Sequence, residues 1–353
     1  MSLCLFLLLL LENNAQVEVI KEFEQPLDVS DESLNFPYSF DFASDGRLFI
    51  ADRWRSRLLV WNKDGSFVGG FCDQGKGPGQ LYFPMKIAVD EKHIYLWEPL
   101  RRISVFDLNI KFIRHIKFPH YQPRVFAPLK QDLFILGFKG ATKKGPVMGF
   151  SLAKAGEEPT EIKMWEDTSY LKATSKELVV KAFPADIDLQ ADGKGSWYMG
   201  YSDNRTLYQL NGEGKVIGEK KFPIPSMKIA DEDIELYNSL SFPRADGKRV
   251  VVSKVPNYKI NYDHEKAFYN HFLIKGDKIL FVQTPMGGQV GFGNGFSQAT
   301  YFIHNFKTGE LLSKGRYAFR EDSMVLFRDG RILGLLISEE EDFEVRELAI
   351  KGL

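Results

Sequence analysis

The strongest constraint on the fold is a repeat, because residues 36–71 and residues 83–118 carry one pattern twice in succession. Equivalent positions lie 45 to 47 residues apart, as in the pairs Pro37 and Pro84, Phe49 and Tyr95, and Trp61 and Phe106. A fixed period of this length is the signature of repeat architectures, in which each copy is one structural unit. The number of copies therefore decides the fold.

Each copy alternates short stretches rich in Phe, Tyr, Ile and Val with turns marked by Asp-Gly or Asn-Gly. This alternation is typical of antiparallel strands joined by tight turns. The first copy predicts four strands, at residues 39–43, 48–52, 57–61 and 67–71. Four such strands make one blade of a β-propeller.

Four further copies can be found, and they begin near residues 123, 183, 271 and 324. We therefore predict an all-β fold, a six-bladed β-propeller of four-stranded antiparallel blades. The last copy ends after its third strand, while Val17–Phe23 is a strand-like stretch ahead of the first copy. Pairing this N-terminal strand with the last blade closes the ring and removes unpaired strand edges.

Two segments break the period, near 225–266 and 287–296. The first contains the best helical candidate, Ile229–Leu240, and the second is rich in glycine. Insertions into repeat proteins tend to project from the face where ligands bind. We expect residues 16–353 to form a single propeller domain that carries both insertions.

The N-terminal stretch Leu3–Leu11 is almost purely aliphatic, and a polar segment that contains Ala15 follows it. This pattern predicts a signal peptide at residues 1–15 and an exported protein, periplasmic, cell-surface or secreted. The run is too short for a transmembrane span, which needs about 20 apolar residues. The alternative is a short buried N-terminal segment.

Composition indicates a folded chain, with 44% hydrophobic, 26% charged and 14% aromatic residues. The 46 basic and 47 acidic residues give a net charge of −1, so no overall field favours nucleic acid. We expect a monomer that does not bind nucleic acid.

The segment Gly75–Pro84, which is followed by Ile87–Asp90, resembles the linker and first strand of NHL-repeat β-propellers. Leu48–Arg53, which leads to Arg57–Trp61, is similar to the same family. The whole chain resembles the bacterial exported six-bladed propellers related to it. This resemblance implies the fold, but it leaves function open, since the wider group includes protein-, nucleic-acid- and sugar-binding modules, lyases and lactonases.

The six histidines contain no pair at metal-ligand spacing. The ligand sets of propeller amidating lyases and sugar lactonases have no matching motifs here, so we predict no cofactor. The preferred hypothesis is a non-catalytic exported scaffold that binds a protein, peptide or glycan through one face. The alternative is a metal-assisted lyase or hydrolase, lactonase-like or amidating-lyase-like, whose site lies at the mouth of the central channel and holds a divalent metal.

Two loops in equivalent positions, residues 53–57 and 97–102, combine arginine with tryptophan. Guanidinium groups beside indoles can bind carboxylates or sugars. Residues shared between copies are expected to serve the repeat, and this interpretation assigns a structural role to Asp52, Arg57, Glu98 and Arg102. The ligand-binding candidates are Arg53, Trp54, Arg55, Trp97 and Arg101.

Export can be tested on the mature chain. If residues 1–15 are a signal peptide, protein recovered after secretion should begin at Gln16. N-terminal sequencing or intact mass measurement gives the answer directly. Recovery of a chain that still carries Leu3–Leu11 would favour the buried-segment alternative.

Overall fold

The structure is a computed structural model. It describes residues 17–21, 37–117, 122–130, 133–142, 145–154, 157–168, 170–173, 178–181, 185–231, 234–235, 238, 241–243, 249–251, 254, 258–263, 265, 267–283, 296–320, 324–328, 330–337, 343–350 and 352–353. The predicted signal peptide and the glycine-rich residues 287–295 lie outside these ranges.

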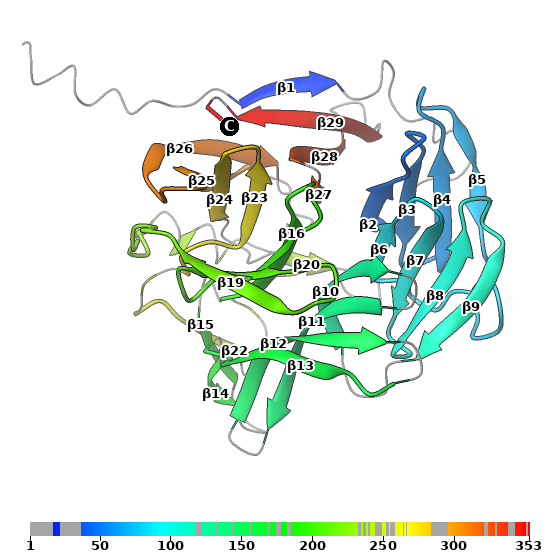
Figure 1. The fold of residues 1–353 in the computed structure, drawn as a ribbon, viewed down its shortest axis with the longest axis horizontal. Coiled ribbons are helices and arrows are strands. Elements are labelled where there is room, and N and C mark those ends of the chain that lie inside the picture. The colour runs from blue at the N-terminus through cyan, green and yellow to red at the C-terminus, as the bar shows by residue number, and fades with distance from the viewer. Residues whose placement is uncertain are drawn as a thin grey trace, which may run out of the picture.

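Six four-stranded antiparallel sheets, the blades, surround a common centre in the described part of the chain (Figure 1). Blade 1 holds β2 (Pro37–Phe42), β3 (Leu48–Asp52), β4 (Arg57–Trp61) and β5 (Phe67–Phe71). Blade 2 holds β6 (Lys86–Val89), β7 (His93–Glu98), β8 (Arg102–Asp107) and β9 (Phe112–Lys117). Blade 3 holds β10 (Gln122–Lys130), β11 (Leu133–Thr142), β12 (Gly145–Lys154) and β13 (Thr160–Glu166).

The other three blades follow the same plan. Blade 4 holds β16 (Ile187–Ala191), β17 (Trp197–Tyr201), β18 (Thr206–Leu210) and β19 (Val216–Lys221). Blade 5 holds β23 (His271–Lys275), β24 (Lys278–Gln283), β25 (Phe296–Asn305) and β26 (Leu311–Arg320). Blade 6 holds β27 (Met324–Arg328), β28 (Arg331–Ile337), β29 (Phe343–Ile350) and β1 (Val17–Lys21). The predicted all-β propeller is confirmed.

Strand β1 comes from the other end of the chain and completes blade 6. It pairs antiparallel with β29, so that Val17 lies opposite Ile350 and Lys21 opposite Arg346. The two ends of the chain therefore share one sheet, and β29 has a strand on each side. Such pairing covers an edge that would otherwise offer free backbone groups to other chains.

Additional strands lie between the blades. A hairpin of β14 (Tyr170–Ala173) and β15 (Leu178–Lys181) precedes blade 4, and β15 pairs in parallel with β22 (Tyr258–Asn261). A two-stranded sheet joins β20 (Ser241–Pro243) to β21 (Arg249–Val251). Thus β20, β21 and β22 all fall in the predicted insertion at 225–266.

The helix predicted in this insertion is described in part. Residues 231, 234–235 and 238 are helical, and the Ile234 N–H donates to the Ala230 carbonyl at 3.2 Å. None of the helical segments in the described ranges is long and apolar enough to cross a bilayer.

The blades are held together by side chains that alternate along each inner strand. All five residues of β3 are buried. Leu48 and Ile50 pack with Leu333 and Leu335 of blade 6, whereas the intervening Phe49 and Ala51 pack with residues of blade 2. Successive side chains of a strand point to opposite faces of its sheet, so one strand joins two neighbouring blades.

Two aspartates add a polar contact between neighbouring inner strands. Oδ2 of Asp41 on β2 accepts the Val89 N–H of β6 at 2.7 Å. Oδ2 of Asp188 on β16 accepts the Phe272 N–H of β23 at 2.9 Å. Both aspartates are buried. They stand 147 residues apart, which is the offset between Pro37 and Pro184 in the repeat.

Removal of this contact should destabilise the fold. Asp41→Ala would leave the Val89 N–H buried without an acceptor, which costs about 1–3 kcal/mol in the free energy of unfolding. Chemical denaturation measures the difference. The matched control is Glu91→Ala, an exposed carboxylate on the next blade, which should change stability by less than about 0.5 kcal/mol. Equal effects of the two substitutions would contradict the assignment.

Candidate functional site

The arginine-containing loops of blades 1 and 2 join the second strand of each blade to the third. Because every blade repeats the same strand directions, these loops open on one face of the ring, here called the loop face. Their backbones match: the Ser56 N–H donates to the Arg53 carbonyl at 3.3 Å, and the Arg101 N–H donates to the Glu98 carbonyl at 3.2 Å. Ser56 and Arg101 both have positive φ, 54° and 57°.

A series of aromatic and cationic side chains crosses the loop face from blade 1 to blade 2. The Arg53 guanidinium lies 4.7 Å from the centre of the Tyr38 ring and 6.0 Å from that of Trp54. Trp54 meets Phe83 edge-on with ring centres 6.0 Å apart. We call the series the aromatic row, and its members are Tyr38, Arg53, Trp54, Phe83, Tyr82 and Lys76.

The rest of the row belongs to the linker between the two blades. Tyr82 meets Phe83 with ring centres 4.8 Å apart, and the Lys76 ammonium lies 5.2 Å from the Tyr82 ring centre. Lys76 is exposed, and the four aromatic side chains of the row are partly exposed. The row therefore presents aromatic edges and positive charge together to solvent.

Two features of the row are costly for the fold alone. Within the described residues, the buried Nε of Arg53 has no hydrogen-bond partner. Phe83 has a φ of 48°, which is rare for a bulky residue, and its N–H donates to Ser56 Oγ at 3.1 Å. Strained backbone and unpaired donors concentrate where a protein binds something.

The five residues that the sequence predicts as ligand contacts lie in different environments in the structure. Arg53 and Trp54 lie side by side in the row. Arg55 is partly exposed, and its N–H donates to Asp52 Oδ1 at 3.3 Å. Arg101 is exposed at the turn of blade 2.

Trp97 does not fit a direct ligand contact. It has 1% of its surface exposed and packs in the core between blades 2 and 3. Strand β7 extends to Glu98, so Trp97 belongs to the strand and not to the loop. Second strands are covered by neighbouring blades on both faces, which explains the burial.

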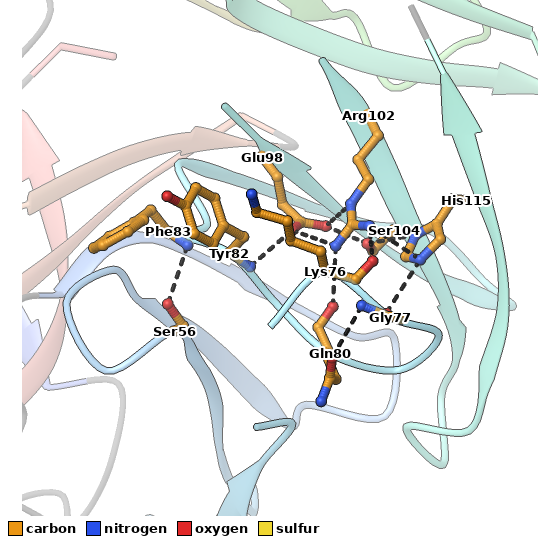
Figure 2. A network of polar contacts seen from close by, with 10 residues as sticks. All are labelled: Ser56, Lys76, Gly77, Gln80, Tyr82, Phe83, Glu98, Arg102, Ser104 and His115. Atoms are coloured by element: carbon orange, nitrogen blue, oxygen red, sulfur yellow. Dashed lines mark hydrogen bonds and ion pairs between the residues drawn. The ribbon is translucent and has the colours of Figure 1, made fainter. Parts of the chain in front are cut away.

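The predicted structural role of Glu98 and Arg102 is visible in a buried polar network (Figure 2). Nε and Nη2 of Arg102 donate to the two carboxylate oxygens of Glu98 at 3.0 and 2.9 Å. Glu98 also accepts the Tyr82 N–H at 2.8 Å and the Ser104 hydroxyl. Arg102 in turn donates to the Lys76 and Gln80 carbonyls, at 2.7 and 3.3 Å.

This network fixes the linker that carries part of the aromatic row. Three of its bonds end on the backbone of Lys76, Gln80 and Tyr82, and a fourth joins Gln80 Oε1 to the Gly77 N–H at 2.9 Å. Glu98 is fully buried. A buried and fully hydrogen-bonded ion pair of this kind positions its surroundings.

His115 from β9 extends the network. Its Nδ1 lies 3.0 Å from Ser104 Oγ, and its Nε2 lies 3.3 Å from Arg102 Nη1 and 3.3 Å from the Gly77 carbonyl oxygen. Burial, and after it the Arg102 charge, lower the pKa of His115, which disfavours the protonated ring.

A second group of polar residues lies near the ring axis and was not predicted from the sequence. Its members are Lys86, Arg124, Asp186, Asp188 and His271. They come from four blades, so no linear spacing joins them. One signal was available: Lys86 and Asp186 stand 47 and 147 residues after Ser39, at a position where the repeats differ. In the described ranges, no three His, Cys, Asp or Glu residues are grouped so that they could hold a metal ion.

Comparison with known proteins agrees with the fold. Residues 30–174, under half of the chain, match the model of the DUF5128 family, described as a 6-bladed beta-propeller. No curated protein matches the sequence. The chain is thus a β-propeller, while the narrower likeness to NHL repeats stays a prediction.

Two solved structures from Bacteroides are similar over nearly the whole chain. A candidate exported protein from Bacteroides fragilis NCTC 9343 shares 13% identity, with a TM-score of 0.52 and coverage of 97% of this chain and 96% of that one. A member of the DUF4221 family from Bacteroides vulgatus ATCC 8482 shares 14% identity, with a TM-score of 0.53 and coverage of 97% and 100%. At these identities the likeness concerns the fold alone.

The lowered pKa of His115 predicts a pH effect on stability. Its folded pKa lies below the ordinary 6.5, so the unfolded chain binds more protons, and stability is full above about pH 6.5 and falls as the pH drops. The substitution His115→Gln should therefore reduce the loss of unfolding free energy between about pH 7 and pH 5. Urea denaturation across this range measures it.

The comparison at pH 8 serves as the control, since the two proteins should there differ only by a constant offset. His304, whose pKa is also lowered by burial, should leave some pH dependence in the variant. If the unfolding free energy fell equally with decreasing pH in both proteins, the role of His115 would be refuted.

Proposed function

We propose that this protein is an exported, non-catalytic propeller that binds a glycan, peptide or protein on the loop face of blades 1 and 2. The aromatic row carries this proposal. Arg53, Trp54, Arg55 and Arg101 are its contact residues, together with Tyr38, Tyr82, Phe83 and Lys76. Trp97 has only the indirect role of supporting β7 from within the core.

The chemistry of the row suggests what it would bind. Partly exposed aromatic rings suit the flat apolar faces of sugars or the side chains of peptides. The Nε of Arg53 lacks a partner among the described residues, and a carboxylate or hydroxyl on a ligand would supply the missing acceptor. With Lys76, Arg55 and Arg101 nearby in the loops and linker, an acidic glycan or acidic peptide is favoured.

Rigid support for the row adds to the argument. The Glu98 and Arg102 network holds the linker backbone, and Ser56 holds the strained Phe83. A binding surface that is ordered before the ligand arrives loses less conformational entropy on binding. Apolar contacts with such a fixed surface therefore contribute more to the free energy of binding.

Export is the second part of the proposal. It is supported by the apolar segment Leu3–Leu11 and by the structural likeness to a candidate exported protein of Bacteroides fragilis. In an extracytoplasmic compartment, glycans and peptides of the surroundings are the available ligands.

Binding can be tested on arrays of glycans and peptides graded by acidity, followed by calorimetry on the probes that bind. Trp54→Ala and Arg53→Gln should each weaken binding about ten- to thirty-fold, equivalent to about 1.4–2 kcal/mol. The matched control for charge is Lys63→Gln. Lys63 is exposed in the turn between the third and fourth strands of blade 1, on the face opposite the loops.

Lys63→Gln should bind like the wild type, and thermal melting should show that each variant is folded. Binding that survives both loop substitutions would place the ligand elsewhere. Failure of every acidic glycan and peptide to bind would remove the proposal.

A further inference from the structure

A group of charges at the ring axis has no part in the binding surface of the loop face. Strands β6, β10, β16 and β23 are the innermost strands of blades 2, 3, 4 and 5, and Figure 1 places them around the middle of the ring. Lys86 begins β6, and Arg124 lies in β10. These two strands contact each other, as do β10 and β16.

The side chains of the two cations make no close polar contact with the protein. In the described part of the chain, neither the Lys86 ammonium nor the Arg124 guanidinium forms a hydrogen bond, or an ion pair within 4 Å, with another side chain. Both side chains are partly exposed although their strands are central. An unpaired cation in the middle of a protein is unfavourable unless something compensates it.

The neighbouring acids compensate the two cations only without direct contact: Asp186 and Asp188 attract Lys86, and Asp186 also attracts Arg124. Asp188 accepts the Leu189 and Phe272 N–H groups at 2.8 and 2.9 Å, and its Oδ2 lies 3.6 Å from His271 Nδ1. Asp186 accepts the Ile187 N–H at 2.9 Å. Burial raises the pKa of Asp186, and the charge of Arg124 lowers it in part.

Electrostatic effects at Lys86 agree with this geometry. Burial, the largest cause, lowers the pKa of Lys86, whereas Asp186 and Asp188 partly raise it and Arg124 lowers it further. The two cations are thus close enough to repel each other. The backbone gives a reason for their approach, since β10 has a register irregularity between Pro123 and Val125, at Arg124. Irregularities of this kind redirect a side chain.

We propose that Lys86 and Arg124 form an anion-binding site at the ring axis, and that its ligand is a small carboxylate. Arginine binds carboxylates through two parallel hydrogen bonds, and lysine adds a point charge. The nearby Asp186 and Asp188 disfavour a doubly charged phosphate. The site draws on blades 2 and 3 and is independent of the aromatic row.

The test uses purified protein with acetate, succinate, phosphate and chloride at equal ionic strength. Succinate or acetate should raise the melting temperature in a saturable manner, and phosphate and chloride should not. Lys86→Met should raise the melting temperature without any anion, because it removes an unpaired central charge, and should abolish the succinate shift. Arg124→Gln should weaken succinate binding by about tenfold or more, as measured by calorimetry.

Lys92→Met is the matched control, because Lys92 is exposed at the end of the same hairpin and should behave as the wild type. Equal stabilisation by phosphate would overturn the carboxylate assignment. Absence of any carboxylate effect at millimolar concentration would overturn the site. So would a Lys86→Met variant that is less stable and still binds succinate. None of these results bears on binding at the aromatic row.

Discussion

The structure depends on the packing of each blade against its two neighbours. A blade has no apolar face that it can bury alone, and β3 illustrates this, since Leu48 and Ile50 need blade 6 while Phe49 and Ala51 need blade 2. Each large apolar side chain buried in this way contributes about 1.5–3 kcal/mol. The contributions accrue only when the neighbours are in place, so a propeller needs a closed ring, and the pairing of β1 with β29 meets that need.

The closed ring of similar blades also explains why the fold could be predicted from the sequence. Every blade solves the same packing problem, so the same residue types recur at the same offsets, and the period located all six sheets. Strands β14, β15, β20, β21 and β22 pack outside this pattern, and their pairing was not predicted. The parallel pairing of β15 with β22 joins segments that no repeat relates.

The candidate site was predictable only in part, for a related reason. The loop residues Arg53 and Trp54 lie in a position that differs between copies, and the structure brings them together with Tyr38 and Phe83. Trp97 does not fit as a contact because it lies within β7 and its side chain is buried between blades 2 and 3. In contrast, Glu98 and Arg102 were assigned correctly to the scaffold.

The charged residues at the ring axis occupy a position at which the repeats differ, so the repeat pattern does not predict their role. At one position of the innermost strands, the first blade has Ser39, whose Oγ accepts the Ile87 N–H at 3.2 Å, and the second has Lys86. The serine serves the contact between blades, whereas the lysine side chain forms no such bond in the described structure and lies among the charges of Asp186, Arg124 and Asp188. A scaffold that is held by several interblade cores can tolerate one unfavourable position. Packing does not require a charge at this position, and the anion site that we propose would give Lys86 a role that the scaffold does not.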